Sequence, residues 1–385
     1  MRFHLENQTL TLYFEGELNS YNAAGVEKEA FETVHGKEFK TLVLDLEHLS
    51  YISSAGLRIV LKLKQKYNDV SAINCSLEVY DIFNMTGFTN IMPVKKALKR
   101  VYVSGAEVIG QGFFSTVYRL DKDTIIKVFN RVSDPEQVER ELRLAKEAFI
   151  LGIPTAISFD IVKVDDKLGV RFEMLDCMSL RDVVVAHPEK AEEYLNKYVA
   201  LLKKINTTEC ENPEIPDIKA FTLQKLETIK PYLDQAHYEK AKKMLKGIPN
   251  RKTFVHGDCH FKNIMVQNEE LILIDMDTLS VGHPIFEFAA LYAPYCAFDE
   301  DDPGNSLRFL KVDQKVVNKL YNELVDRTFT DHGEDVKNKI RIVSYIHMVW
   351  WNRLNEPQNN VRMEGCRGRL YELLDRYDDL IIPYE

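Results

Sequence analysis

The sequence predicts an α/β fold for residues 1–103, followed by an α+β fold of two lobes for residues 104–385. Three observations lead to this prediction. In the first range, segments with strand-like and helix-like hydrophobic periodicity alternate along the chain. In the second range, strand-like segments fill a small lobe at 104–175, and helix-like segments dominate a large lobe at 176–385. A short stretch at 103–106, which contains a serine and a glycine, marks the boundary between the two ranges.

The overall composition is that of a soluble globular protein with more than one domain. The 385 residues exceed one ordinary core, and hydrophobic and charged residues make up 45% and 28% of the chain. No apolar run approaches the roughly 20 residues that span a bilayer. The first residues contain no apolar signal segment. We therefore expect a cytoplasmic protein that does not interact with a membrane.

The six cysteines predict neither a metal site nor a disulfide framework. No two of them form a CxxC pair, which argues against zinc and fits a reducing compartment. They are Cys75, Cys177, Cys210, Cys259, Cys296 and Cys366.

The net charge of −9 is carried entirely by the second range. Residues 1–103 hold twelve Lys and Arg and twelve Asp and Glu, so this range is neutral. An acidic main domain argues against binding to nucleic acid phosphates. It would suit a cationic substrate, although net charge alone is a weak indication.

The first range contains the signals of a layered α/β domain. Apolar and polar residues alternate at 10–14, as in a half-buried strand, and 41–46 is a nearly continuous apolar run, as in a buried strand. A helix is expected after the turn at 53–57, capped by one of its two serines. A further strand is expected at 75–80, before an amphipathic segment.

These residues resemble a STAS domain, the fold of bacterial anti-sigma-factor antagonists. The resemblance covers nearly all of residues 1–100 and is carried by 44–46, by the turn at 53–57 and by 83–88. In that family the turn usually reads Asp-Ser-(Ser/Thr)-Gly-Leu, and the serine after the aspartate is a phosphorylation switch. The resemblance implies a regulatory or partner-binding domain.

The switch serine of the family corresponds to Ser54 in this chain. Ser53 takes the place of the aspartate, and Ala55 precedes the glycine. A phosphate at a helix N-terminus meets free backbone N–H groups, so the physics allows a phosphorylation site at Ser54. A serine at this position is more often only a helix cap. Both interpretations of Ser54 stay open at this point.

The small lobe begins with a strand, a glycine-containing turn and a second strand over 107–120. Gly110 and Gly112 would let backbone amides approach phosphate groups closely, and Ser115 stands where protein kinases have a third glycine. Lys127 is a single charge inside the apolar strand 124–129. A buried lysine is costly unless it is paired, and this one would contact the nucleotide phosphates, as the corresponding lysine does in kinases.

The next helix and strand supply further candidates for the nucleotide site. Glu141 borders the apolar stripe of the helix and could pair with Lys127, with Glu136 and Glu139 as competing candidates. The strand at 169–175 is expected to end the small lobe. Residues 173–175, from Glu173 to Leu175, would form the hinge that holds the adenine base in kinases.

The strongest chemical signal lies at 253–266. Asp258 and Asn263 are five residues apart, which is the interval in the protein-kinase catalytic loop. A carboxylate there can accept the proton of an acceptor hydroxyl, and an amide oxygen can bind Mg²⁺ without adding charge. Asp275 follows at the end of an apolar strand, where its carboxylate would reach the metal ions. Asp277 would support it or be bonded within the turn.

These motifs resemble the aminoglycoside phosphotransferase and choline kinase superfamily, which has a protein-kinase-like fold. The His-Gly-Asp-x-His motif at 256–260 carries the resemblance, together with the element at 282–289, in which Glu287 replaces an aspartate. The resemblance covers about residues 105–300. It implies ATP or GTP as donor and Mg²⁺ as cofactor, with Asp258 as catalytic base and with Asn263 and Asp275 as metal ligands. The two histidines are interpreted as loop braces.

The acceptor substrate should be determined by the large lobe, but its identity is not predicted. The acidic run at 299–302 could attract an amine, although a solvated loop is the favoured interpretation. Trp350 and Trp351, with Tyr345 and His347, could line an acceptor pocket or could belong to the core. Choline, homoserine and sugar kinases all belong to the superfamily.

Three functional hypotheses follow from the sequence. The first is a phosphotransferase that acts on a hydroxyl of a small molecule and is regulated through its STAS-like domain or docks through it to a protein partner. The second is a regulatory protein serine kinase that modifies a partner or its own Ser54. The third is a pseudokinase that only binds, and the presence of Lys127, Asp258, Asn263 and Asp275 argues against it.

Overall fold

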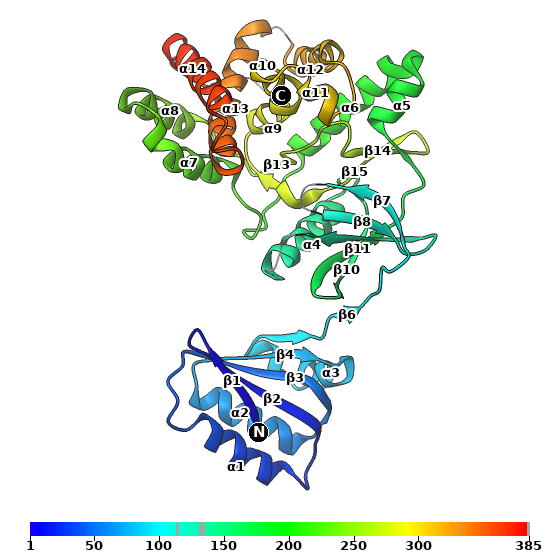
Figure 1. The fold of residues 1–385 in the computed structure, drawn as a ribbon, viewed down its shortest axis with the longest axis vertical. Coiled ribbons are helices and arrows are strands. Elements are labelled where there is room, and N and C mark those ends of the chain that lie inside the picture. The colour runs from blue at the N-terminus through cyan, green and yellow to red at the C-terminus, as the bar shows by residue number, and fades with distance from the viewer. Residues whose placement is uncertain (113–114, 131–134, 331, 383–385) are drawn as a thin grey trace. The chain divides into compact units, whose positions relative to one another are not determined.

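The computed structural model forms two compact units (Figure 1). It describes residues 1–112, 115–130, 135–330 and 332–382. The first unit consists of Met1–Tyr102 and Val162–Asp166, and the second of Val103–Ile161 and Lys167–Glu385. Within the described residues, no helix has both the length and the apolar character that crossing a membrane requires.

The first unit is an α/β layer structure around a five-stranded sheet with the order β1-β2-β3-β4-β5. Only β1 runs antiparallel to its neighbour, and the other pairs are parallel. Apolar side chains of the sheet and the helices form one core. The strands are β1 (Arg2–Glu6), β2 (Thr9–Leu18), β3 (Thr41–Ile52), β4 (Asp69–Cys75) and β5 (Val94–Lys96), and the helices are α1 (Ala23–Val34), α2 (Ser54–Lys66), α3 (Leu77–Met85) and η1 (Phe88–Asn90).

The strand predicted at 75–80 is wrong, because β4 ends at Cys75 and α3 begins at Leu77. Ser76 caps the helix by accepting a hydrogen bond from the backbone N–H of Val79 at 3.2 Å. Val79 and Phe83 then share the buried face of α3. A serine cap followed by Val79 and Phe83 at helical spacing favours a helix. The apolar residues of this segment alone fit a strand equally well.

The two serines of the turn before α2 occupy different positions relative to the helix. Ser53 is the N-cap, and its side chain accepts a hydrogen bond from the N–H of Gly56 at 3.4 Å. Ser54 is the first residue of the helix, and its side chain is exposed. Gly56 packs so closely on β2 that an added Cβ would lie 2.7 Å from the side chain of Leu18. The helix can approach the sheet there because this position is a glycine.

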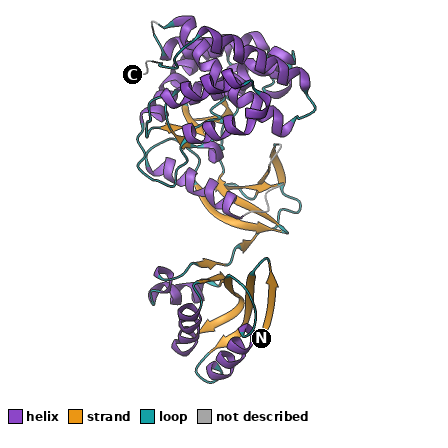
Figure 2. Ribbon diagram, turned by 90° about the vertical axis from the view of Figure 1, so that its left-hand side faces the viewer, coloured by secondary structure: helices purple, strands orange, loops and turns teal. Residues whose placement is uncertain are grey.

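The small lobe of the second unit is a twisted antiparallel sheet with one covering helix (Figure 2). Its strands are ordered β10-β11-β9-β8-β7. The predicted hairpin corresponds to β7 and β8. The elements are β7 (Glu107–Gln111), β8 (Ser115–Arg119), β9 (Thr124–Phe129), α4 (Pro135–Ile150), β10 (Ser158–Val164) and β11 (Lys167–Glu173). The short strand β6 (Lys99–Arg100) pairs in parallel with Val162 and Lys163 at the end of β10, and this pairing belongs to the first unit.

The large lobe is mostly helical, and two small sheets carry the loops of the candidate site (Figure 2). Its central helix α13 packs against α14, α9 and α7. The strands are β12 (Met178–Ser179), β13 (Phe254–Val255), β14 (Ile264–Gln267), β15 (Glu270–Leu273) and β16 (Ser280–Val281). The helices are α5 (Leu180–Ala186), η2 (Pro188–Lys190), α6 (Ala191–Thr207), α7 (Ile218–Ile229), η3 (Lys230–Tyr232), α8 (Gln235–Gly247), η4 (Met276–Thr278), α9 (Ile285–Tyr292), η5 (Ala293–Ala297), α10 (Phe298–Asp301), α11 (Asn305–Phe309), α12 (Gln314–Thr328), α13 (Gly333–Asn355) and α14 (Asn360–Arg376). The predicted fold class, an α/β unit followed by a two-lobed α+β unit, is confirmed.

Candidate active site

The centre of the candidate site is the ammonium group of Lys127. This residue lies on β9, between β8 and β11 in the middle of the small-lobe sheet. Its Nζ lies 2.8 Å from Oε1 of Glu141 on α4 and 2.6 Å from Oδ1 of Asp275 after β15. The lysine therefore joins the small-lobe sheet, the helix α4 and the segment that follows the catalytic loop.

The electrostatics of this cluster explain why a buried lysine is tolerated. Burial alone would lower the pKa of Lys127, but the negative charges of Asp275 and Glu141 outweigh it and hold this pKa above its usual range. Burial raises the pKa of Glu141, and Lys127 opposes that effect. Burial also acts to raise the pKa of Asp275, yet the charge of Lys127 keeps it below its usual value. Lys127 and Asp275 thus stabilise each other's charged form, whereas at Glu141 the effect of burial exceeds that of Lys127.

Among the three glutamates considered from the sequence, Glu141 forms the ion pair with Lys127. Glu141 is 4% exposed, so its carboxylate depends on this partner. The side chain of Glu136 lies outside the described residues.

The catalytic loop begins after β13 and ends at β14. The side-chain amide of Asn263 donates hydrogen bonds to the backbone oxygen of Asp258 at 3.0 Å and to its Oδ2 at 2.9 Å. These bonds close the five-residue loop and orient the carboxylate of Asp258. Although the side chain of Asp258 is 42% exposed, the protein groups packed around its carboxylate and the charge of Asp275 raise its pKa to about 7, while the bond from Asn263 acts in the opposite direction.

A buried glutamate holds the catalytic loop through hydrogen bonds to its backbone. Glu287 on α9 is fully buried, and its carboxylate accepts hydrogen bonds from the N–H groups of His256 at 2.6 Å and Gly257 at 3.2 Å. Burial raises the pKa of Glu287 to about 7, and the two backbone bonds oppose the rise. The sequence marked Glu287 only as a departure from a family pattern. A carboxylate in a helix of otherwise apolar residues was the available signal for a bracing role.

The two histidines of the motif make their contacts within the loop. Nδ1 of His256 accepts a hydrogen bond from the N–H of Asp258 at 3.2 Å. Nε2 of His260 lies 3.6 Å from Oδ1 of Asp258. Burial lowers the pKa of each histidine to about 4, so both are neutral near pH 7. Neutral, buried rings are suited to positioning the loop.

The backbone around the acidic groups adopts left-handed conformations at two positions. Gly257 has φ +80°, and a Cβ there would lie 3.3 Å from the carbonyl oxygen of Thr278. Asp275 has φ 64° and ψ 66°, a conformation that residues with a side chain rarely adopt. Such local strain is frequent at functional sites. Asp277 follows in η4 with an exposed side chain.

The remaining predicted residues of the nucleotide side lie along the small-lobe hairpin and at its far strand. Gly110 pairs with Val117 across β7 and β8, and the N–H of Gly112 donates to the carbonyl of Ser115 at 2.9 Å. Residues 113 and 114, at the tip of the predicted phosphate-binding turn, lie outside the described residues.

The predicted hinge is partly occupied by contacts of its own. The N–H and the carboxylate of Glu173 both bond to the backbone of Ile157, at 2.9 and 2.7 Å. The N–H of Met174 donates to Asp123. Leu175 is half-buried, and its carbonyl accepts from the thiol of Cys177 at 3.5 Å.

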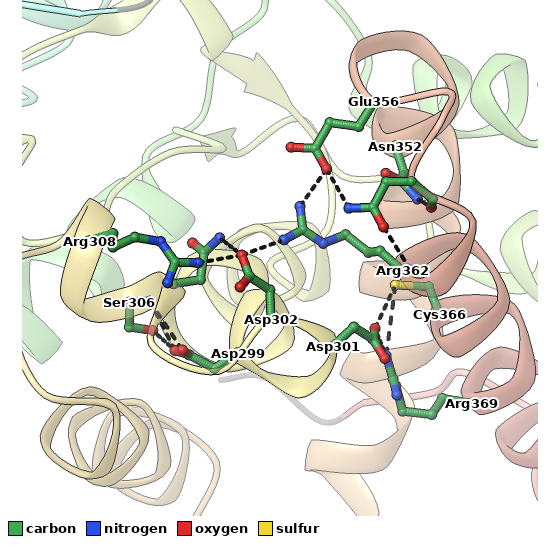
Figure 3. Close-up of polar contacts among 12 residues, drawn as sticks. Asp299, Asp301, Asp302, Ser306, Arg308, Asn352, Glu356, Arg362, Cys366 and Arg369 are labelled. Atoms are coloured by element: carbon green, nitrogen blue, oxygen red, sulfur yellow. Dashed lines mark hydrogen bonds and ion pairs between the residues drawn. The ribbon is translucent and has the colours of Figure 1, made fainter.

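The acidic run at 299–302 is not a solvated loop, and that interpretation is wrong. Figure 3 shows that its carboxylates turn toward side chains of the large lobe. Asp299 is 3% exposed and accepts hydrogen bonds from the N–H and hydroxyl of Ser306. Asp301 pairs with Arg369, and Asp302 pairs with Arg308.

Two arginines of α14 form the remaining ion pairs of this cluster. Arg362 is nearly fully buried and bonds to Glu356 at 2.9 Å and to Asp302 at 3.4 Å (Figure 3). Nε of Arg369 lies 2.7 Å from Glu300. Three acids of the run are therefore paired with arginines, and Asp299 is buried and bonded to Ser306, so none of the four carboxylates is a solvated group at the surface.

The aromatic residues predicted for α13 divide between two surroundings. Tyr345 is fully buried and donates to Glu300 at 2.7 Å, and Trp351 packs near Phe298. Tyr345 belongs to the core. His347 lines a cavity beside Lys225 on α7. Trp350 packs against the core, and the ammonium of Lys225 lies over its ring.

Residues 105–308, which contain the whole candidate site, match the sequence pattern of the APH family, described as phosphotransferase enzyme family. The chain belongs to this family. It is therefore a phosphotransferase. Residues 3–101 match the STAS domain. Both predicted resemblances are confirmed.

Curated relatives match the STAS domain of this phosphotransferase. A putative anti-sigma factor antagonist, BtrV, from Bordetella bronchiseptica is 40% identical over 84 residues, which are 21% of this chain and 72% of the relative. An anti-sigma-B factor antagonist from Listeria monocytogenes is 30% identical over 90 residues, covering 22% of this chain and 78% of the relative.

Solved structures similar to the phosphotransferase unit share little sequence with it. The gentamicin complex of APH(2")-IIa is 15% identical, with a TM-score of 0.44 and coverage of 72% of this chain and 93% of the other. A choline/ethanolamine kinase family protein from Mesorhizobium loti is 12% identical, with a TM-score of 0.47 and coverage of 70% and 88%.

Proposed function

We propose that the second unit transfers the γ-phosphate of ATP or GTP, with Mg²⁺, to a hydroxyl group of a small molecule. The observation that supports this most directly is the position of Lys127, whose Nζ contacts both Glu141 and Asp275. The same arrangement holds a strand lysine against a helix glutamate and a metal-binding aspartate in kinases. We propose that the STAS domain provides regulation or a docking surface for a protein partner.

The donor atoms on the catalytic side suit Mg²⁺. Both hydrogens of the Asn263 amide point to Asp258, which leaves its oxygen as the atom for a metal. In the described part of the chain, no three His, Cys, Asp or Glu residues are grouped to hold a metal by themselves. Mg²⁺ commonly takes only one or two protein oxygens and completes its shell with phosphates and water. Asn263 and Asp275 would hold it, where it would neutralise charge on the transferring phosphoryl group.

The remaining residues bind and orient the reactants. Lys127 would contact the α- and β-phosphates, and the hairpin with Gly110, Gly112 and Ser115 would cover them. The adenine would be held at the hinge, where the N–H groups of Glu173 and Met174 are already used. We therefore assign the base contact to the backbone of Leu175. Asp258 would accept the proton of the attacking hydroxyl.

Incubation of the full chain with γ-labelled ATP or GTP and Mg²⁺ tests this function. A panel of amino alcohols, hydroxy acids, sugars and aminoglycosides would serve as acceptors, with label followed into solution products and into protein. Transfer to a panel member that requires Asp258 would support the proposal. A full chain that binds no Mg²⁺–nucleotide by titration calorimetry would refute it.

A second candidate function is phosphorylation of Ser54 by the same unit. The observation in its favour is that Ser53 makes the helix-capping bond, which leaves the hydroxyl of Ser54 exposed. Covalent linkage raises the effective concentration of this serine near the kinase unit, if the geometry allows reach. Mass spectrometry after incubation with Mg²⁺–ATP should then find a phosphate on Ser54. Absence of phosphate from the protein while a small molecule is phosphorylated would reject this candidate.

A further inference from the structure

A cavity of about 160 Å³ lies directly beside the catalytic loop. Gly257, which precedes the proposed base, lines it, and so do residues of η4. The other walls come from α4, α7, α9 and α13. The residues that decide its chemistry are Arg140, Phe221, Lys225, Asp277, Thr278 and His347.

Lys225 gives this cavity a buried positive charge. Lys225 is only 6% exposed, and its Nζ lies 2.9 Å from Nδ1 of His347. The ammonium also lies over the rings of Phe221, at 4.4 Å, and Trp350, at 4.8 Å. No carboxylate among the described residues forms an ion pair with it. Burial lowers the pKa of Lys225 to about 8, so the group is mostly charged at pH 7.

The surrounding groups satisfy only part of the hydrogen-bonding capacity of the Lys225 ammonium and only part of its charge. Burial, followed by the nearby charge of Lys225, lowers the pKa of His347 to about 3. The ring is therefore neutral, and its Nδ1 accepts one of the three ammonium hydrogens. Aromatic faces stabilise a desolvated cation by about 2 kcal/mol, which is less than the cost of burying an unpaired charge. An additional negative group would complete the site.

The other charged groups of the cavity wall agree with an anion. Arg140 on α4 is exposed, and no carboxylate in the described part of the chain pairs with it. Asp277 is the one acidic residue lining the cavity among those described, and it is exposed. The described lining thus holds two cationic side chains and one carboxylate, so the cavity is basic although the unit as a whole is acidic.

We propose that this cavity binds a carboxylate or phosphate group of the acceptor, through Lys225 and Arg140. This inference rests on the proposed phosphotransferase function and narrows its acceptor to a compact hydroxy acid or phosphate ester. The volume equals that of a few water molecules, at about 30 Å³ each, so it accommodates one small group and not an aminoglycoside. The neighbouring Gly257 places the bound acceptor close to Asp258.

Titration calorimetry of the full chain at pH 7 and constant chloride tests this proposal. The probes are glycerate, glycerol 3-phosphate, glycerol and ethanolamine, with Mg²⁺–ADP present. We expect at least one of the two anions to bind about tenfold more tightly than glycerol and ethanolamine, because a charge-assisted bond is made only by an anion. Preference for glycerate would identify a carboxylate site, and preference for glycerol 3-phosphate a phosphate site.

Three variants connect the result to the cavity. Lys225→Met should abolish the preference for anions, and Lys225→Arg should keep most of it. Lys243→Met, which removes an exposed lysine of the neighbouring α8, should bind as the wild type does. Circular dichroism and Mg²⁺–ATP affinity show whether each variant is folded. Equal binding of all four probes, or anion binding that survives Lys225→Met, would overturn the proposal.

The two proposals can fail separately. If the anion binds through Lys225 but the chain never transfers phosphate to any acceptor, the proposed function is wrong and the anion site stands. If the chain phosphorylates a cationic alcohol and neither anion binds, the proposed function stands and the basic acceptor site is wrong.

Discussion

Two buried lysines of the phosphotransferase unit differ in how their charge is balanced. Lys127 touches two carboxylates, which hold its pKa above the usual value. Lys225 touches a neutral histidine and two aromatic rings, and burial lowers its pKa to about 8. The first lysine is part of an internally balanced network. The second is a cation whose balance is left to a ligand.

This difference shows that a buried charge has different consequences when it is paired and when it is unpaired. A paired charge organises the protein, because it fixes the elements that carry its partners. An unpaired charge at a cavity wall lowers stability and creates affinity for the opposite charge. The Arg–Asp cluster around 299–302 belongs to the first type, which is why it carries no proposal about a ligand.

The largest expected effect is on catalysis, in the loop that lies near both lysines. Asp258→Asn should lower the rate of transfer by about 10³-fold, because the hydroxyl loses its proton acceptor. Binding of Mg²⁺–ATP and of the anionic probes should change little, since different residues hold each ligand. Rates and calorimetry on the same preparation measure both quantities. The matched control is Asp378→Asn, a 98% exposed aspartate, which should be as active as the wild type.

Replacement of the balanced lysine should strongly destabilise the fold. Lys127→Met leaves Glu141 buried without a partner, and we expect a loss of about 3 kcal/mol in the free energy of unfolding. Urea unfolding at pH 7 measures it. The double variant Lys127→Met/Glu141→Leu should recover much of that loss, because it removes the stranded charge. A single variant as stable as the wild type would show that the network is not a stabilising one.

Replacement of the unbalanced lysine should act in the opposite direction. At pH 7, Lys225→Met should leave stability unchanged or raise it by about 1–3 kcal/mol, since a lowered lysine pKa is a cost to the folded state. Between about pH 8 and the unfolded value of 10.5, the unfolded chain binds more protons, so the wild type gains stability as pH rises.

The advantage of the variant should therefore shrink across that range. Urea unfolding of both proteins from pH 7 to 10 tests the comparison, and only the difference between them is informative because other groups titrate too. A variant that is less stable at pH 7, with no convergence at higher pH, would mean that Lys225 is balanced within the protein.

The smallest expected effect is a difference in stability between variants of the two serines of the STAS domain. Ser53 makes a hydrogen bond within the protein, as Lys127 makes ion pairs, whereas the side chain of Ser54 is exposed. Ser53→Ala should lower stability by about 1 kcal/mol, because it removes the helix cap. Ser54→Ala should change it by less than about 0.5 kcal/mol, as usual for exposed positions. Thermal unfolding of both variants measures the difference. The reverse order of effects would assign the cap to Ser54 and weaken its role as a phosphorylation site.

Local sequence patterns predicted the fold class and part of the elements. Alternation and helical spacing located strands and a helix of the first unit, and the hairpin and the strand with Lys127 lie where they were expected. The large lobe was predicted to be helical, but its individual helices were not located. The strand at 75–80 was wrong, because the apolar pattern there fits either structure and the cap at Ser76 decides it. The acidic run was misinterpreted for a different reason. Its arginine partners come from α11, α13 and α14, and no local pattern connects them.

The sequence by itself marked Lys127 as a side chain that needs a partner, because it is a single charge inside an apolar strand. It did not mark Lys225, whose burial on α7 became visible only in the fold. The order of Lys127, Asp258, Asn263 and Asp275 along the chain indicated the chemistry of the candidate site.

Only the tertiary structure decided which partner each side chain has. Lys127 and Asp275 are separated by 148 residues, and Lys225 and His347 by 122. Such pairs form when packing brings distant elements together, and their energy depends on the water that packing removes. The sequence therefore indicated one buried charge, Lys127, and the fold decides whether each buried charge is balanced within the protein or left for a ligand.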